Sequence, residues 1–454
     1  MTHQRLYPIV IHQREIPRST KIHHVQEYMK IYFIEAERDK SQPPTSNWFD
    51  PLTHKFSCPS LGPLLIASLT PKDIEVRIID EKIEEIQLDD LPDAVAISFK
   101  TMSSRRAYEL AGMFREKQVK VILGGIHASL LPEEAKSHCD SVVIGEAEEV
   151  WPSIIDDLQH NQLRPSYRMP QLTDLLKLGI PRYELLQNNG YICHSIQTSR
   201  GCSLNCDFCP TREMFGGVFR TKSVKQVLQE IQEALSIEKK YIFFTDDIFG
   251  AGDETFTMEL LQHLKKLKIE FFVISDFLVL NKNILLALAR SGCRYIALNM
   301  PGTCSKREVQ AIKMIQRLGI DVWGYFMFGF RFHEKDVFKK VFDFVNATHI
   351  KHVSLTVMTP YPNTFAGREL DKQGRILSKE WTLYDNEHVV FEPENMKAKD
   401  LEEGFNWIRQ KISYLVQIRS DEDRSIWKIF TGRCLAGILA MLPSKSRKSS
   451  ERPQ

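Results

Sequence analysis

The sequence lacks an excess of charge of either sign and lacks an apolar segment long enough to cross a membrane. Its 454 residues carry 60 basic and 58 acidic side chains, a formal net charge of +2. Proteins whose main partner is nucleic acid usually carry a strong basic excess, so that partner class is excluded. The longest uncharged apolar run near the end, residues 434–443, falls well short of the roughly 18 residues of a membrane span.

Several common catalytic motifs are also missing. The chain has no G-x4-G-K-[ST] phosphate loop, no G-x-S-x-G nucleophile elbow and no H-E-x-x-H metal helix. The apolar patch near the N-terminus, residues 6–11, is too short for a signal-peptide core. We therefore expect a cytoplasmic protein whose 9 cysteines are thiols or ligands rather than disulfides.

The composition, 43% hydrophobic and 26% charged, is that of a folded protein. A prior of about 150 residues per domain suggests roughly three domains. Within residues 29–160, short apolar runs alternate with helical patterns, which predicts an α/β fold with a doubly wound, Rossmann-like parallel sheet. The predicted strands are 29–35, 74–80, 93–99, 119–125 and 141–145.

Ligands of such sheets bind beyond the carboxyl ends of the strands. Gly124 and Gly125 fall at such an end, as do residues 98–104 and Gly145 with Glu146. The glycines could admit a ligand close to the backbone, or they could simply make tight turns. Both interpretations stay open at this point.

The second half of the chain repeats a strand–helix unit. Residues 190–375 contain six such units, which predict a partial (βα)6 barrel with its reactive groups at the carboxyl ends of the strands. We assign 161–189 to a linker, 376–443 to a small helical C-terminal domain, 1–28 to an N-terminal extension and 444–454 to a basic tail. Residues 425–443 form either a helix packed on the body or a contact with a membrane surface.

Three cysteines stand together after the first strand of the second block. Cys202, Cys206 and Cys209 have the spacing C-x3-C-x2-C on one loop bounded by Gly201 and Pro210. Three converging soft ligands favour an iron-sulfur cluster, in which one iron keeps an open position. Structural zinc is the main alternative, but it requires four ligands.

This strand–loop–helix order, with the aromatic Phe208 before the last cysteine, resembles the radical S-adenosylmethionine (SAM) superfamily. The resemblance covers about residues 190–375. It implies that the three cysteines hold a 4Fe-4S cluster whose unique iron binds the methionine moiety of SAM. It also implies that the reduced cluster cleaves SAM to a 5'-deoxyadenosyl radical.

The same resemblance assigns further positions to SAM. Asp246 and Asp247 stand where the family receives the amino group of SAM, although they could instead cap the following helix. Met327 lies in the strand that matches the adenine-binding strand. At the end of the fourth strand the usual Gly-Ile-Glu-Ser motif is replaced by residues 297–302, where Asn299 is the remaining polar candidate.

The first block resembles the cobalamin-binding domain that precedes many radical SAM barrels, through IEVRIIDE, VILGGIHASLLPEEA and VVIGEAEEVWP. None of the 14 histidines has an aspartate two positions before it, so the Asp-x-His-x-x-Gly motif that ligates cobalt is absent. His127 is the one histidine beside a candidate binding loop. We expect any bound cobalamin to lack protein histidine ligation.

Together the resemblances imply a radical SAM enzyme, with cobalamin-dependent C-methylation of a small molecule or lipid as the expected reaction. The alternatives are a radical rearrangement or cyclisation without cobalamin, and a non-catalytic cluster-binding protein, which the altered fourth strand suggests. The enzyme would receive electrons from a donor such as flavodoxin or ferredoxin.

Overall fold

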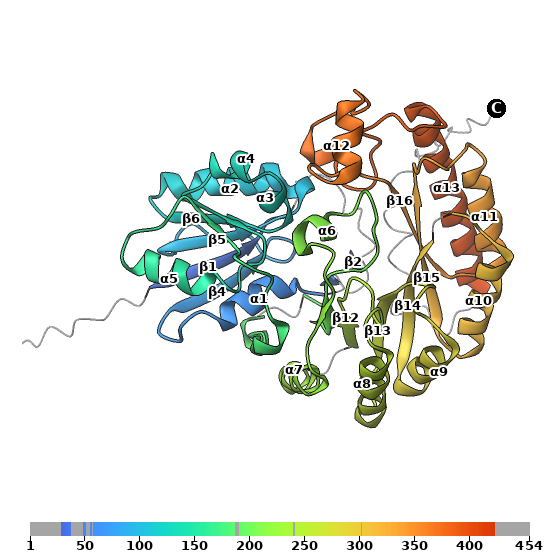
Figure 1. The fold of residues 1–454 in the computed structure, drawn as a ribbon, viewed down its shortest axis with the longest axis horizontal. Helices are drawn as coiled ribbons and strands as arrows, with labels where there is room; N and C mark the ends of the chain where they lie inside the picture. The colour runs from blue at the N-terminus through green and yellow to red at the C-terminus, as the bar shows by residue number, and fades with distance from the viewer. Residues whose placement is uncertain are drawn as a thin grey trace, which may run out of the picture.

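The structure, a computed structural model, describes residues 29–37, 49–50, 55–56, 58–186, 190–238, 241–300 and 302–422. Within these residues the chain forms two parallel six-stranded sheets that stand beside each other (Figure 1). The predicted N-terminal extension, the basic tail and the membrane contact at 425–443 lie outside the described residues. No helix in the described part is long and apolar enough to cross a membrane.

The first sheet has the strand order β4-β1-β5-β6-β7-β8, with every pair parallel. The strands are β1 (Lys30–Glu35), β4 (Glu75–Asp80), β5 (Ala94–Ser98), β6 (Lys120–Gly124), β7 (Ser141–Ile144) and β8 (Ser166–Arg168). Because β1 lies between β4 and β5, the chain reverses its direction of winding there, and ligands bind beside such a point in open α/β sheets. The strand β8 falls within the segment predicted as a linker.

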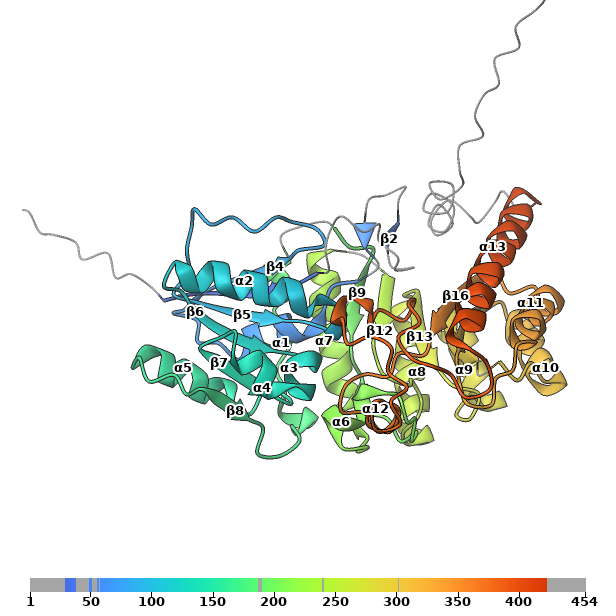
Figure 2. The same cartoon turned by 90° about the horizontal axis from the view of Figure 1, so that it is seen from above.

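Helices cover both faces of this sheet, which confirms the doubly wound fold (Figure 2). They are α1 (Leu61–Ser68), α2 (Ser104–Glu116), α3 (Ile126–Leu130), α4 (Pro132–Lys136) and α5 (Trp151–Gln159). Alternate residues of β1 enter opposite cores: Tyr32 and Ile34 pack in one cluster, Ile31 and Phe33 in the other. This burial on both faces explains the continuous apolar runs in the sequence.

The second sheet has the order β16-β15-β14-β13-β12-β9, again all parallel, and it curves into the predicted partial barrel. In the described residues β9 and β16 form its two edges. The strands are β9 (Cys193–Ile196), β12 (Tyr241–Phe244), β13 (Phe271–Ser275), β14 (Cys293–Met300), β15 (Asp321–Phe328) and β16 (His352–Val357).

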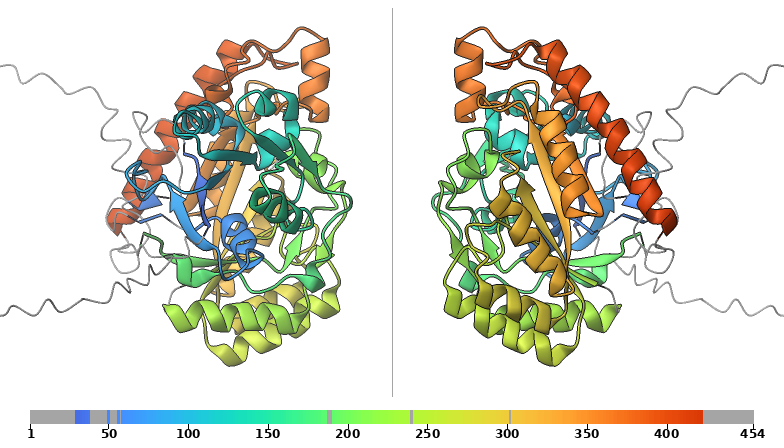
Figure 3. Two further views of the ribbon diagram at one scale, coloured as in Figure 1. Left: turned by 90° about the vertical axis from the view of Figure 1, so that its left-hand side faces the viewer. Right: turned by 90° about the vertical axis from the view of Figure 1, so that its right-hand side faces the viewer.

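The helices of the barrel begin at recognisable caps. Ser223 with Gln226, and Ser305 with Glu308, form capping boxes at two of them. The helices are α7 (Val224–Ile237), α8 (Glu254–Leu267), α9 (Lys282–Ser291), α10 (Lys306–Arg317) and α11 (Val337–Thr348). Figure 3 shows α7 and α8 together along one side of the barrel.

The C-terminal element packs on both parts of the molecule. It contains α12 (Phe365–Lys372), the short 3-10 helix η4 (Trp381–Leu383) and α13 (Ala398–Glu422), which lies along α11. The indole N–H of Trp381 donates to Glu134 of the first domain at 3.1 Å, and the side chain of Asn363 donates to the Leu130 carbonyl. The element therefore bridges the two sheets.

Candidate functional site

The three-cysteine loop begins after β10 (Ser199–Arg200) and ends at α6 (Pro210–Phe215). Gly201 has φ +90°, and a Cβ atom there would lie 2.0 Å from the carbonyl oxygen of Val218, so the position accepts only glycine. Cys209 donates its backbone N–H to the Cys206 carbonyl at 3.2 Å, and Pro210 starts α6. The loop is thus a compact turn rather than an extended linker.

The three thiols are half-buried and lie close enough to influence one another. Burial, followed by the neighbouring Cys209 and Cys202 thiols, raises the pKa of Cys206 to about 11. Burial also raises the pKa of Cys202, whose sulfur accepts the N–H of Leu204 at 3.4 Å. Adjacent thiolates that repel one another are stabilised by a shared cationic iron-sulfur unit, so the donor set fits such a group.

In the described part of the chain, no three cysteine, histidine or carboxylate side chains are grouped to hold one metal ion. A multi-iron cluster is larger than a single ion and requires its ligands to stand further apart. The three thiols are fewer than the four ligands that structural zinc requires, so the loop fits a cluster better than the zinc alternative.

The two adjacent aspartates after β12 have different surroundings. Asp246 is 1% exposed, and its carboxylate accepts the backbone N–H groups of Thr198 and Ser199 at 2.6 and 2.9 Å. Asp247 is half-buried and accepts the backbone N–H of Gly201 at 3.0 Å and the hydroxyl of Thr211 at 3.2 Å. Asp246 therefore fixes the strand that leads into the loop, and Asp247 contacts the loop itself.

The remaining barrel candidates lie at the carboxyl ends of β14 and β15. Asn299 is exposed between the buried Leu298 and Met300, and it pairs in register with Tyr325. Met327, two residues further along β15, is half-buried on the same face. The ring of Phe208 lies 5.4 Å from the ring of Phe330, just beyond β15. The structure thus brings Phe208 to the end of the predicted adenine-binding strand.

The candidates in the first domain differ in accessibility. Gly125 has φ +94°, and a Cβ atom there would lie 2.9 Å from the Phe99 carbonyl oxygen, so packing alone requires glycine. At Gly124 the nearest described atom is 3.8 Å away, so packing leaves room for a side chain. His127 is fully buried, with its Nε2 3.2 Å from Glu134. His127 is thus enclosed by protein, and its contact with a ligand stays a prediction.

A buried ion-pair network joins the two sheets. Glu146, in the turn after β7, accepts Arg200 at 2.7 Å and Arg220 at 2.8 and 2.9 Å. Glu148 accepts Arg200 at 2.7 Å. Burial acts to raise the pKa of Glu146, but its hydrogen bonds and ion pairs with Arg220 and Arg200 outweigh burial and lower it. The carboxyl edge of the first sheet therefore contacts the residue that precedes Gly201.

Two known families match the chain in the same order as the two sheets. The B12 binding domain matches residues 53–155, and the radical SAM superfamily matches residues 196–345. The chain belongs to the radical SAM superfamily, in the subgroup with an N-terminal cobalamin-binding domain. The cofactors of these two families are a 4Fe-4S cluster, SAM and cobalamin.

Relatives of this radical SAM protein include characterised methyltransferases. It is 27% identical over 376 residues to the bacteriochlorophyllide d C-12(1)-methyltransferase of Chlorobaculum tepidum, covering 78% of this chain and 82% of the relative. It is 28% identical over 362 residues to the bacteriochlorophyllide d C-8(2)-methyltransferase of the same organism. This match covers 72% of this chain and 79% of the relative. These similarities identify an enzyme of the cobalamin-dependent radical SAM methyltransferase family.

The fold of this radical SAM protein is also found in a solved structure. The methyltransferase TsrM of Kitasatospora setae, determined with cobalamin and a [4Fe-4S] cluster, matches with a TM-score of 0.59 and 14% identity. The match covers 83% of this chain and 85% of TsrM. The arrangement of both domains is therefore shared with TsrM.

One carboxylate near the cysteines of this radical SAM protein was not predicted. Asp276 follows β13, and its charge adds to the burial that raises the pKa of both Cys202 and Cys206. Its carboxylate also accepts the N–H of Leu278 at 2.9 Å. An acidic residue directly after a predicted strand was the available signal, as it was for Asp246 and Asp247.

The barrel of this radical SAM protein encloses an apolar cavity. Its aromatic rings contact one another in series: Phe272 lies 5.4 Å from Tyr295, and Tyr295 lies 5.1 Å from His352. Ala297 of β14 and Tyr325 of β15 line this cavity. Asn299 and Met327 follow them two positions further along each strand, so they lie on the same side of the sheet. The lining residues are Ile192, Cys193, Phe243, Phe272, Val273, Ile274, Tyr295, Ala297, Trp323, Tyr325 and His352.

Proposed function

We propose that this radical SAM enzyme transfers a methyl group to an unactivated carbon of a small-molecule or lipid substrate. The supporting observation is the contact between Glu146, at the carboxyl edge of the B12-binding sheet, and Arg200, which leads into the three-cysteine loop. The two edges that are expected to bind the cofactors are thereby in direct contact. A rearrangement without cobalamin would not need this arrangement.

The residues of the chain have distinct roles in this proposal. Cys202, Cys206 and Cys209 hold the 4Fe-4S cluster. Asp247 lies beside the loop, where its carboxylate can receive an ammonium group of SAM, whereas Asp246 is fully engaged in holding Thr198 and Ser199.

Two further positions complete the binding surface for SAM. Phe208 with Phe330 offers an apolar face for adenine, and Asn299 offers the one exposed amide at the end of β14. When bound, the reduced cluster supplies the electron that splits SAM into methionine and a 5'-deoxyadenosyl radical, and methylcobalamin supplies the methyl group.

The aromatic cavity supports an apolar substrate. Phe243, Phe272, Tyr295 and Trp323 line it, and the indole N–H of Trp323 is already satisfied by Ser354 at 2.8 Å. A charged substrate would lose its hydration there without gaining polar partners, which is costly. The lining of this cavity therefore favours an apolar group over a charged one.

Electrons would come from a protein donor such as flavodoxin or ferredoxin. Such a donor is needed because the cluster must be reduced before SAM is cleaved.

The decisive experiment begins with anaerobic purification and reconstitution with iron, sulfide and cobalamin. The protein should bind about four irons per chain, as one 4Fe-4S cluster requires, and it should retain cobalamin. With dithionite and methyl-labelled SAM it should form 5'-deoxyadenosine and labelled methylcobalamin. A full cluster without 5'-deoxyadenosine would refute the enzyme, and failure to retain cobalamin would refute the methyltransferase.

A further inference from the structure

Two arginines stand directly opposite each other at the base of the cysteine loop. Arg200 of β10 pairs with Arg220 of β11 (Arg220–Thr221) in a two-stranded antiparallel ladder. Like charges in such positions repel each other and weaken the pair. The ladder nevertheless closes residues 201–219, the segment that contains all three cysteines.

Glu146 neutralises this repulsion from another domain. Its two carboxylate oxygens accept both arginines, and its Oε2 also accepts the backbone N–H of Thr173 at 2.8 Å. Arg220 in turn donates to the Thr173 carbonyl at 2.7 Å. The Glu146 side chain is 2% exposed, against 9% for Arg200 and 14% for Arg220. The network is therefore shielded from solvent, where ion pairs are strong and a missing partner is costly.

Glu148 provides an internal comparison. It accepts Arg200 at 2.7 Å, and it is as buried as its partner, but its hydrogen bonds and ion pairs do not reach Arg220 or Thr173. Only Glu146, among the described acidic residues, contacts both arginines of the ladder. Loss of Glu148 leaves both arginines paired, whereas loss of Glu146 leaves Arg220 without its carboxylate.

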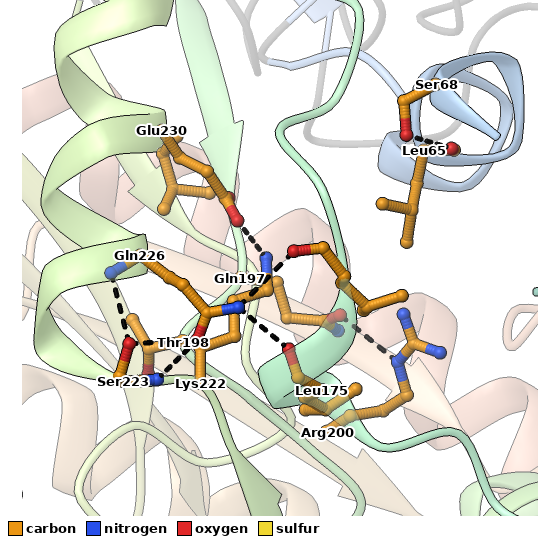
Figure 4. A network of polar contacts seen from close by, with 12 residues as sticks. Leu65, Ser68, Leu175, Gln197, Thr198, Arg200, Lys222, Ser223, Gln226 and Glu230 are labelled. Atoms are coloured by element: carbon orange, nitrogen blue, oxygen red, sulfur yellow. Dashed lines mark hydrogen bonds and ion pairs between the residues drawn. The ribbon is translucent and has the colours of Figure 1, made fainter.

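The loop has separate anchors within the barrel. Asp247 holds the Gly201 N–H, and Asp246 holds the strand before it. Within the barrel, the side-chain oxygen of Gln197 accepts the Nε–H of Arg200 at 3.2 Å, and Lys222 pairs with the buried Glu230 nearby (Figure 4). Removing Glu146 thus takes the carboxylate from Arg220, so that, among the described residues, Glu148 and the Thr173 carbonyl alone link the ladder to the first domain, while the loop stays attached to the barrel.

We propose that Glu146 is a positioning residue that sets the cluster loop at a fixed distance from the carboxyl edge of the B12-binding sheet. The inference rests on the proposed function, because the edge is expected to carry cobalamin. Glu146 acts through Arg200 and Arg220, and its effect is on the spacing of the two cofactors rather than on either cofactor alone.

The test compares Glu146→Gln with the matched control Glu148→Gln in the full chain, reconstituted with iron, sulfide and cobalamin. Pulsed electron paramagnetic resonance measures the distance distribution between the reduced cluster and cob(II)alamin. We expect a distribution at least twofold broader in Glu146→Gln and an unchanged one in Glu148→Gln. Formation of 5'-deoxyadenosine from SAM and dithionite should stay within about twofold of the wild type in both variants.

Three results would overturn the inference. One is a wild-type distance distribution in Glu146→Gln, and another is equal broadening in both variants. The third is loss of iron from Glu146→Gln, which would make Glu146 a residue of loop folding. If that variant does not fold, Glu146→Gln/Arg220→Gln removes the unpaired charge together with the link, and it should give the same broadened distribution.

Failure of the proposed function is recognised separately. If the wild type retains no cobalamin, hydrogen exchange is measured on the full chain instead. Faster exchange of residues 199–221 in Glu146→Gln than in Glu148→Gln supports the positioning role of Glu146. Equal exchange in the two variants refutes that role.

Discussion

The carboxylate of Asp246 accepts the backbone N–H of Thr198 at 2.6 Å, so the turn after β12 holds the segment that leads into the cysteine loop. Its neighbour Asp247 instead contacts Gly201. Two identical adjacent residues thus have different partners: Asp246 holds the segment before the loop, and Asp247 holds the loop itself.

Asp246 should make stability depend on pH. Burial raises its pKa to about 6, although Thr198, Ser199 and Lys222 act to lower it. Because the folded pKa lies above the unfolded value of 3.8, the folded state holds the proton more tightly, and stability falls as pH rises from about 4 to 6. A shift of about two units corresponds to at most about 3 kcal/mol. Urea unfolding of the apo chain should show that the wild type loses unfolding free energy between pH 4.5 and pH 7 relative to Asp246→Asn. If the difference in unfolding free energy between the two proteins is the same at both pH values, the prediction is contradicted.

Cys206→Ala should abolish the visible absorbance of the cluster and most of the bound iron. The circular dichroism spectrum should stay that of a folded protein, because Cys206 lies on a loop outside the three hydrophobic clusters of the two domains. Cys139→Ala is the control, since Cys139 packs in a core cluster of the first domain. Survival of the iron content in Cys206→Ala would disprove the ligand assignment.

Gly201→Ala should prevent the loop from closing. The new Cβ atom would lie 2.0 Å from the Val218 carbonyl oxygen, at a φ of +90°. Gly217→Ala is a matched control, because it also has a positive φ, +71°, but no described atom within 4 Å. The control should cost about 1–2 kcal/mol of unfolding free energy and keep the cluster. Gly201→Ala should cost more and lose the iron, as measured by urea unfolding and iron analysis; equal effects would argue against the clash.

Trp381→Phe should weaken the contact between the C-terminal element and the first domain. It removes the donor to Glu134, while Tyr108 and His127 continue to contact that carboxylate. We expect a loss of about 0.5–1.5 kcal/mol, the usual net contribution of a hydrogen bond. Trp407→Phe, at an indole 39% exposed on α13, should change the unfolding free energy less. A larger effect at Trp407 would place the stabilising contact elsewhere.

Much of the fold could be predicted because its strands are buried on both faces. The apolar runs located eleven of the strands, five in the first block and six in the second. The strand β8 was not predicted, because three residues with one buried side chain, Tyr167, carry no periodic signal.

The site was less predictable, because its contacts join residues far apart in the sequence. The cysteine spacing is local and could be recognised directly, although the ligand assignment stays a prediction. The bond between Glu146 and Arg200 spans 54 positions, and the position of Asp276 near Cys206 depends on the curvature of the sheet. Burial of His127 likewise depends on Trp381, whose ring lies 5.6 Å away.

The strand β8 also affects where the chain can be divided. It pairs in parallel with β7 through Val142, Val143 and Ile144, and so it covers the edge of the first sheet. A chain cut after residue 160 would expose unpaired backbone groups on β7, and such edges recruit strands from other molecules. The B12-binding region should therefore aggregate when expressed without residues 161–174, and it should stay monomeric when they are kept.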